Sequence, residues 1–349
     1  MDDGALSTAS TRLARSRVVP LMIQTMRPPP PIASRQFGAF SRTQALAAGW
    51  TRSALAHGVQ SGQLRRLRRG AFVQATSLDG NDLAAARRRF AGSAAGALLV
   101  TPAAVASHAT AAVLAGLPVW LLPERPCLTV PPRHTGDADG VHLHRATLNP
   151  NDLRPAGALM RTSTARTVCD LAREHGAEDA VIVADAALRR QLITPAQLDR
   201  CLQDCALWPG IRRARAAVAL ADGRAESPLE SISRLRLTAA GVPRPDLQPE
   251  LYDANGRWLG RPDFYWDDYG VVGEVDGKMK YVESPDRAVL WAEKQRQERF
   301  EETGLVVVRW GYAQLNDLPR LVDRLYHAFG RGGRRMPDDR NWIARRRAA

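Results

Sequence analysis

The strongest constraint in the sequence is a short apolar segment that carries acidic residues at alternate positions. Residues 271–277 read VVGEVDG, and the part before Glu274 is apolar enough for a buried strand. Alternate side chains of a strand share one face, so Glu274, Asp276 and Lys278 are expected to point the same way. Carboxylates crowded together are costly to bury unless a cation lies between them. The segment therefore predicts a metal-binding face.

The flanking residues supply the other elements of an α/β domain over residues 224–330. A helix is expected from the Ser-Pro-Leu-Glu start at 227–230, because serine caps the helix and proline suits its first turn. Two strands joined at Asn255-Gly256 follow, and Asp263 is expected near the end of the second. After the acidic strand come a long helix that stops at Gly304 and a final apolar strand, LVVVRW. The expected order is αβββαβ.

Asp263 can add a further carboxylate to the acidic face from the neighbouring strand. Oxygen ligands with open positions suit Mg²⁺ or Mn²⁺, which keep bound waters and take up substrate phosphates. Such an ion lowers the pKa of an attacking water, and a nearby lysine stabilises the charge that develops on phosphorus. These groups together predict hydrolysis of phosphodiester bonds.

The lysines of the chain are unusually placed. Lys278, Lys280 and Lys294 are the three lysines among 349 residues, and they fall within 17 positions beside the acidic strand. Lysine is a compact charge with a tunable pKa, which arginine is not, so a catalytic lysine is expected here. The literal acid-x-Lys match is Asp276-Gly277-Lys278, but Gly277 lets the strand bend, and Lys280 before Tyr281 remains a rival. Chance clustering is the alternative.

The motifs RPDF, EVDGKMKY and WAEKQRQERFEETGLVVVRW resemble the DUF559 and very-short-patch-repair-like branch of the PD-(D/E)XK nucleases, which have a restriction-endonuclease-like fold. The resemblance covers about 105 residues. It implies that Asp263 and Glu274 are metal ligands, with Asp276 beside them. The very-short-patch enzymes rely on a histidine near this place that the chain lacks, so their mismatch specificity is not expected.

Each of these residues has a simpler explanation. Glu230 either belongs to the catalytic site or serves as the capping-box partner of Ser227. Asp263, Glu274 and Asp276 could instead form a surface salt-bridge cluster, which an apolar strand with two acids on one face disfavours. The predicted helix after the acidic strand also carries two residues that either contact phosphate or lie on an ordinary charged face, Lys294 and Arg296.

The N-terminal part carries a different signal. Residues 35–78 contain seven arginines and no Asp or Glu. Capped helices beginning after Ser41 and Thr51, followed by a basic hairpin turning at Gly70, predict a winged helix-turn-helix over residues 35–80. Its second helix would enter the DNA major groove, and the hairpin would lie on phosphates. A small helical cap with a solvated arginine face is the alternative. The expected DNA contacts are Arg52, Arg65, Arg66, Arg68 and Arg69.

The remaining segments are less informative. Residues 1–34 are predicted to be a disordered leader, 81–223 an α/β middle domain and 331–349 a basic tail. Within the middle domain His108 is expected to be a packed core residue, and His142 with His144 is too small a set to predict a metal site. The four cysteines are expected to be buried thiols. The chain shows neither a transmembrane segment nor a convincing signal peptide, which favours the cytoplasm.

The phrases RRLRRGAFV, SHATAAVLAGL and TSTARTVCDLA resemble the AbiEi-type antitoxins of bacterial toxin–antitoxin systems, over about residues 35–200. That resemblance implies repressor-like DNA binding. The net charge of +13 also favours a polyanionic partner. Two functions are therefore expected of this α/β multidomain chain. One is an Mg²⁺- or Mn²⁺-dependent endodeoxyribonuclease, and the other is a non-catalytic transcriptional regulator or antitoxin of a type IV-like system. The expected partners are DNA and either a second copy or a cognate toxin-like protein.

Overall fold

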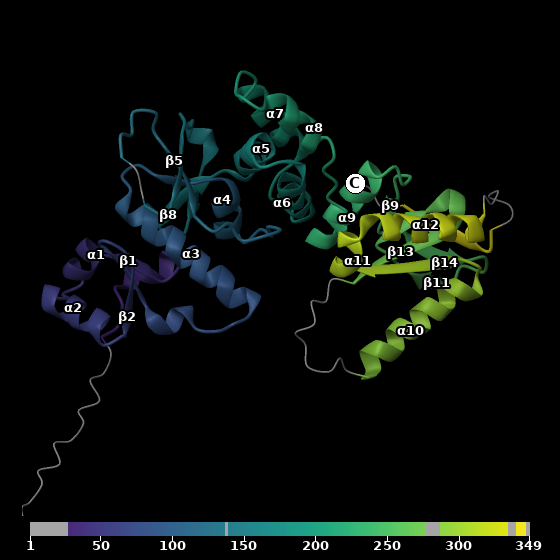
Figure 1. Cartoon of the computed structure of the whole chain (residues 1–349), viewed down its shortest axis with the longest axis horizontal. Helices are drawn as coiled ribbons and strands as arrows, with labels where there is room; N and C mark the ends of the chain where they lie inside the picture. Colours follow the sequence, from purple (N-terminus) through teal and green to yellow (C-terminus); the bar gives the residue numbers. More distant parts are fainter. Residues whose placement is uncertain (1–26, 137–138, 277–286, 334–339, 347–349) are drawn as a thin grey trace, which may run out of the picture.

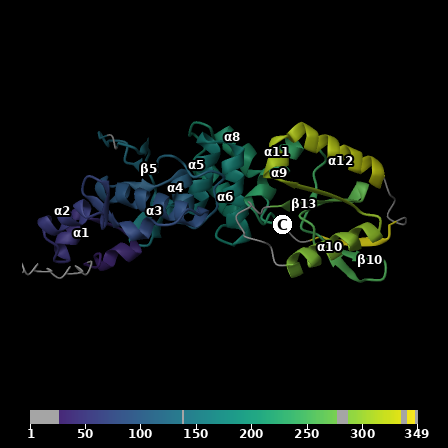
Figure 2. The ribbon, with the colours of Figure 1, turned by 60° about the horizontal axis from the view of Figure 1, so that its bottom comes forward.

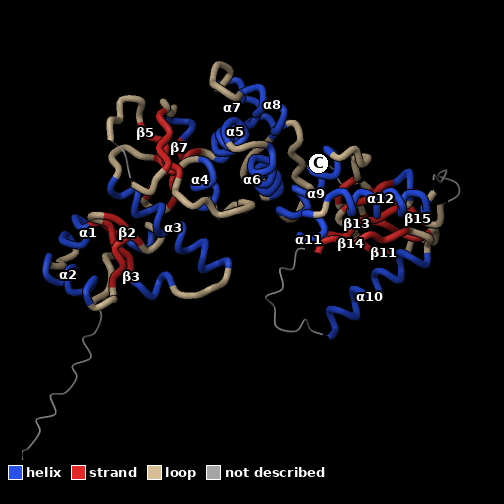
Figure 3. The backbone as a smooth tube through the Cα atoms, in the orientation of Figure 1, coloured by secondary structure: helices blue, strands red, loops and turns tan. Residues whose placement is uncertain are grey.

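The computed structural model describes residues 27–136, 139–276, 287–333 and 340–346. Three units follow one another along the chain (Figure 1), and the turned view of Figure 2 places the first and last at opposite ends of an elongated molecule. Helices and strands alternate throughout, and Figure 3 shows separate sheets in the three units. The expectation of a mixed α/β multidomain chain is confirmed at this level. No helix in the described ranges is long and apolar enough to cross a bilayer.

The N-terminal unit is a small three-stranded antiparallel sheet with two short helices. Its strands pair in the order β1-β3-β2. Phe40, Trp50, Leu55 and Phe72 fill its core together with Ala33. The elements are η1 (Pro31–Arg35), β1 (Ala39–Ser41), α1 (Arg42–Ala47), α2 (Arg52–Gln60), β2 (Leu64–Arg68) and β3 (Ala71–Gln74).

The buried Ala33 corrects the boundary of the predicted leader. Residues 31–35 form the helix η1, so the folded unit begins before residue 35. Residues 1–26 of that predicted leader lie outside the described residues. A further short helix, η2 (Ala75–Leu78), leads to α3 (Leu83–Val100), which packs against the N-terminal sheet and against the next unit.

The middle unit pairs a five-stranded sheet with a group of helices. The strand order is β6-β5-β4-β8-β7, and the helices α5 to α8 gather around their own apolar core. Before the longer strands, the chain forms the short strand β4 and then helix α4, which starts at His108. The elements are β4 (Val105–Ala106), α4 (His108–Leu114), β5 (Cys127–Val130), β6 (His142–Arg145), η3 (Pro150–Asp152), β7 (Leu153–Ala156), β8 (Leu159–Thr162), α5 (Thr164–Glu174), α6 (Ala177–Arg189), α7 (Pro195–Asp204) and α8 (Ile211–Val218).

The four cysteines are free and buried, as expected. Three of them pack among the helices of this middle unit, in the same apolar core as Val168 and Leu198.

The C-terminal unit has a four-stranded central sheet of order β14-β13-β12-β9. Neighbouring strands are antiparallel except β13 and β14, which are parallel. The parallel pair needs a crossover, and α10 supplies it. These elements are α9 (Pro228–Ala239), β9 (Asp246–Leu247), β12 (Phe264–Trp266), η4 (Asp267–Tyr269), β13 (Val271–Asp276), α10 (Arg287–Glu302), β14 (Val306–Gly311), α11 (Tyr312–Asn316) and α12 (Leu318–Gly332).

Apolar layers cover both faces of this sheet. Helices α9 and α12 close one face over Phe264 and Trp310, while α10 closes the other through Phe300. Gly273 in β13 lies against the indole of Trp310, and a Cβ there would come within 2.6 Å of that ring. The glycine of the acidic strand is therefore required by packing, since any side chain would collide with the buried indole.

The predicted pair of long strands over 247–266 is divided between two sheets. The turn at Asn255-Gly256 joins β10 (Glu250–Asp253) to β11 (Trp258–Gly260). These two strands form a separate sheet with β15 (Trp342–Arg345), in the order β11-β10-β15. The prediction of a basic tail over 331–349 is wrong for its described part, because α12 continues to Gly332 and Trp342 is buried. Residues 334–339 and 347–349 lie outside the described residues.

Candidate functional site

The basic hairpin of the N-terminal unit presents arginines on a fixed base. Leu64 and Phe72 are buried, which anchors β2 and β3 to the small core. Arg65, Arg66 and Arg69 are exposed. Because the strands are held by apolar contacts, the guanidinium groups are free of any packing role and available to a polyanion.

Arg68 differs from the other arginines of the hairpin. Its guanidinium donates hydrogen bonds to the carbonyl oxygens of Asp139 and Gly140, the second at 3.1 Å. Burial lowers the pKa of this guanidinium. Arg68 therefore ties the hairpin to the middle unit, and the structure makes it a weaker candidate for a phosphate contact than the sequence pattern indicated.

Helix α2 shows the exposure pattern of a helix that can approach DNA. Thr51 caps it by accepting a hydrogen bond from Ala54 N at 3.0 Å. Leu55 is buried, while Arg52 and the outward side chains of the helix are exposed. The exposed residues of α2 are Arg52, Ser53, Ala56, His57 and Gln60.

In the C-terminal unit, one glutamine joins two of the predicted acids. Gln248 Nε2 donates to Glu230 Oε2 at 3.1 Å and to Asp263 Oδ1 at 2.9 Å. Gln248 is buried and has a positive φ of 52°, which is rare for a side chain of this kind. Residues in strained conformations cluster at functional sites. No sequence pattern singles out Gln248, because a single glutamine beside a turn is common.

The cap of α9 bears on one of the two roles expected for Glu230, that of capping-box partner. Ser227 Oγ accepts a hydrogen bond from Glu230 N at 3.2 Å, so serine is the N-cap. The Glu230 carboxylate, however, accepts from Glu226 N at 2.8 Å and from Gln248. It therefore faces the acidic cluster and does not complete a capping box with Ser227.

Electrostatics set Glu230 and Asp263 apart from ordinary surface acids. Burial, followed by the nearby charge of Asp263, raises the pKa of Glu230 to about 7. Burial also raises the pKa of Asp263, although its Oδ2 accepts a hydrogen bond from Val275 N at 2.7 Å. Asp263 lies immediately before β12, whereas the sequence pattern placed it near the end of a strand. Perturbed carboxyl groups of this kind are typical of functional sites.

The two acidic residues of strand β13 differ in how deeply they are buried. Glu274 is buried and forms an ion pair with Arg296 on α10, whose Nη2 lies 2.5 Å from Oε2. Asp276, the last residue of β13, is exposed. In this arrangement the arginine supplies the positive charge that a buried glutamate needs.

The donor set fits a hard cation. Glu230, Asp263 and Glu274 offer oxygen ligands alone, and Mg²⁺ typically binds through one or two carboxylates and several waters. The ligand atoms of Asp263, Glu274 and Asp276 do not all lie within 4.8 Å of one another, so these residues do not form a preformed three-ligand site. Among the described residues, three potential ligands that do lie this close are His108, His144 and Glu174. A cation at the acidic cluster would therefore rely on water for most of its ligands.

Of the three predicted lysines, the structure describes Lys294. Lys278 and Lys280 lie outside the described residues. Lys294 on α10 is exposed, lies 3.7 Å from Glu298 and sits 5.8 Å from the centre of the Trp291 ring. These contacts match the charged helix face that was the simpler expectation for Lys294.

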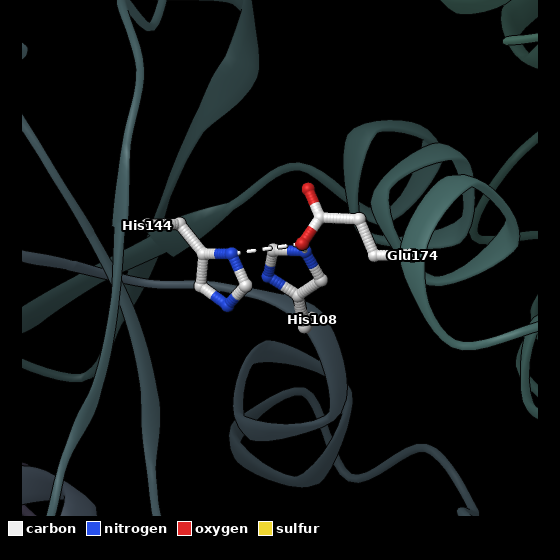
Figure 4. Close-up of side chains that lie close together, drawn as sticks. All are labelled: His108, His144 and Glu174. Carbon is white, nitrogen blue, oxygen red and sulfur yellow. Dashed lines mark ion pairs between the residues drawn. The ribbon is translucent and has the colours of Figure 1, made fainter. Parts of the chain in front are cut away.

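The histidine cluster of the middle unit was missed by the sequence analysis. His108 begins α4, His144 lies on β6 and Glu174 ends α5, and their side chains converge (Figure 4). Glu174 Oε2 lies 3.4 Å from His108 Nε2 and 2.9 Å from His144 Nδ1. The three residues are far apart in the chain, so no spacing motif could have linked them.

Comparison with known proteins finds a similarity for the N-terminal unit. Residues 29–73 match the family model of the AbiEi antitoxin transcriptional regulators. This part of the chain is therefore similar to a transcriptional regulator family. The matched segment contains η1, both helices and the basic hairpin, and it supports the first part of the AbiEi resemblance.

Two relatives in Mycobacterium tuberculosis are similar over a longer stretch. They are the uncharacterized proteins MT2308 of strain CDC 1551 and Rv2248 of strain H37Rv, each 30% identical over 156 residues. The match covers 45% of this chain and 56% of each relative. The crystal structure of the RV2827C protein from the same species aligns with 56% of this chain and 83% of its own, at 17% identity and a TM-score of 0.30. That score is too low to support an argument about fold.

Proposed function

We propose that the chain is a DNA-binding regulator that contacts DNA through its N-terminal unit. The observation that carries the proposal is the acid-free module in which a capped helix and an arginine hairpin are both exposed. Helix α2 would lie in the major groove, and Arg65, Arg66 and Arg69 would contact phosphates on either side. The family match over residues 29–73 supports this function.

DNA binding is tested by fluorescence anisotropy of the full chain with duplex DNA at several salt concentrations. Each lost phosphate contact should lower the slope of log affinity against log salt by about 0.9. Arg65→Ala/Arg66→Ala removes two such contacts and should therefore weaken binding and reduce the slope by about 1.8. The matched control is Arg212→Ala/Arg215→Ala, which removes the same charge from exposed positions on α8. Equal losses in both variants would show that net charge, and not the hairpin, governs binding.

A specific observation favours a second function, metal-dependent hydrolysis of DNA by the C-terminal unit. Gln248 holds Glu230 and Asp263 in one buried network beside Glu274. Along the chain, α9 and the elements of the central sheet follow the predicted αβββαβ order, with the β10–β11 hairpin inserted. Asp263 and Glu274 would hold Mg²⁺ or Mn²⁺. When bound, such an ion activates water and neutralises charge on the phosphate. Gln248 would orient the Asp263 carboxylate, and Glu230 would hold a proton near neutral pH. Lys278 or Lys280 would complete the site.

The nuclease proposal is tested by incubating the full chain with supercoiled plasmid and Mg²⁺ or Mn²⁺. Asp263→Asn/Glu274→Gln should abolish cleavage. The control Glu298→Gln/Glu301→Gln removes two exposed acids from α10 and should cleave like the parent. Cleavage that persists in the double variant would come from a contaminant. If the parent binds DNA without cutting under either metal, the regulator function stands alone.

A further inference from the structure

The middle unit contains a second set of metal-ligand residues, remote in the chain from the acidic cluster. His108 is buried, with 1% of its surface exposed, and its ring stacks on that of His144 with centroids 3.8 Å apart. Two further imidazoles lie close by, since His142 stacks on His144 at 4.5 Å and His175 lies 5.5 Å from His108. Four of the seven histidines of the chain thus gather at one place.

The surroundings of His108 fix the direction of its ring. His108 Nδ1 lies 3.0 Å from Ser107 Oγ, a buried hydroxyl, and Nε2 faces Glu174 Oε2. If Nδ1 donates to serine, a lone pair of Nε2 points directly at a carboxylate oxygen. Two facing acceptors repel each other unless a proton or a cation lies between them. A hydrogen bond to the outer nitrogen is also how proteins orient imidazoles that bind metals.

The side chain of His144 and the backbone of His108 give two further indications of a ligand-binding site. His144 Nδ1 lies 2.9 Å from the same Glu174 oxygen, and the buried Nε2 of His144 has no hydrogen-bond partner among the described residues. His108 has a φ of 52°, in the left-handed region that side chains other than glycine rarely adopt. Strained residues of this kind are typical of ligand sites. Packing that holds a buried histidine in such a conformation fixes its Nε2 in place.

One side of the cluster opens into a cavity of about 410 Å³. Beside the cluster itself, Arg166, Arg173 and Trp208 line this cavity. Arg166 pairs with Asp152 and Asp170, while Arg173 pairs with Asp170 and, at 3.5 Å, with Oε1 of Glu174, so carboxylates balance both guanidinium groups. The cavity leaves room for water or a small ligand next to the three donors.

We propose that His108, His144 and Glu174 bind a single Zn²⁺ ion, or a divalent transition-metal ion with similar ligand preferences, with the remaining coordination position open to this cavity. Two imidazole nitrogens and one carboxylate oxygen suit zinc better than Mg²⁺, which prefers oxygen ligands. Three protein ligands with an open position are typical of zinc sites that bind water or substrate. The ion would also join the start of α4, strand β6 and the end of α5.

The site is tested by calorimetric titration of Zn²⁺ into the full chain, freed of any affinity tag and of metal. The titration uses the Asp263→Asn/Glu274→Gln background, so the acidic cluster does not contribute. One Zn²⁺ per chain is expected. Co²⁺, used as a spectroscopic substitute, should give visible absorption bands typical of nitrogen-containing four- or five-coordinate sites.

Ligand variants decide the assignment. Glu174→Gln is the mildest change, because Glu174 is partly exposed, and it should weaken Zn²⁺ binding on the order of 100-fold. His144→Ala should do the same. His327→Ala, which removes an exposed histidine of α12, should bind like the background. Circular dichroism confirms that each variant is folded. Unchanged stoichiometry and affinity in Glu174→Gln and His144→Ala would overturn the proposal and leave a purely hydrogen-bonded histidine cluster.

Discussion

Arg234 on α9 and Asp185 on α6 form a buried ion pair that joins the middle unit to the C-terminal unit. Nη2 of the arginine lies 2.8 Å from Oδ2 of the aspartate, and both side chains are at most 3% exposed. Ser231 Oγ donates to the same oxygen at 2.8 Å, while Asp222 N donates to the other at 2.6 Å. The two units are therefore joined by a buried polar network as well as by apolar contact.

Asp185→Ala should destabilise the chain strongly, because it leaves the Arg234 guanidinium buried without its counter-charge. Losing one partner of a buried pair costs about 3–5 kcal/mol. The matched control lies on the same two helices, where Glu178 pairs with Arg236 at 2.7 Å and the two side chains are 41% and 27% exposed. Glu178→Ala should cost less than about 1 kcal/mol. Urea unfolding followed by tryptophan fluorescence measures both, and equal losses would contradict the assigned role of burial.

Glu230 should give the C-terminal unit a pH-dependent stability. Its pKa is about 7 in the folded chain against an ordinary value of 4.5, so the folded state holds a proton that the unfolded state releases. Stability from this group is complete below pH 4.5 and is lost as pH rises towards 7, by on the order of 3 kcal/mol. Glu230→Gln should remove that decline. Unfolding in chelator-containing buffer at a series of pH values tests this, and parallel curves for parent and variant would refute it.

Arg296 should compete with metal ions for Glu274. The guanidinium already neutralises this carboxylate, so a cation has to displace it or share Oε2. Arg296→Gln is therefore expected to tighten Mn²⁺ binding several-fold, as measured by electron paramagnetic resonance of the free ion. Arg299→Gln is the control, since Arg299 on the same helix donates to the Leu259 carbonyl instead. Weaker Mn²⁺ binding in Arg296→Gln would argue against a metal at Glu274.

Trp342 should be essential to the C-terminal unit although it lies in a segment that reads as a tail. It is buried, its Nε1 donates to Tyr265 Oη at 2.6 Å, and its ring packs on Gly270. Trp342→Ala should cost about 3–5 kcal/mol through the cavity that it leaves. The adjacent Ile343 is 52% exposed, so Ile343→Ala should change stability by less than about 1 kcal/mol. Thermal unfolding distinguishes the two.

The local sequence pattern determined several helix starts, one turn and one strand of this protein. The caps at Ser41, Thr51 and Ser227 and the turn at Asn255-Gly256 lie where the sequence predicts them, because capping and turn chemistry act within a few residues. The apolar acidic strand was also predictable, since its alternation is written in consecutive positions. The strand β15 was not, because its pairing with β10 joins residues about 90 positions apart.

Tertiary structure decided which polar side chains meet. Glu230 faces the acidic cluster through Gln248, and Arg68 is drawn into the middle unit; neither outcome follows from spacing. His108, His144 and Glu174 come from three elements separated by tens of residues, and the folding of the middle unit alone brings them together. Sequence periodicity reports the neighbours of a residue on its own element, whereas a site depends on the packing of one element against another.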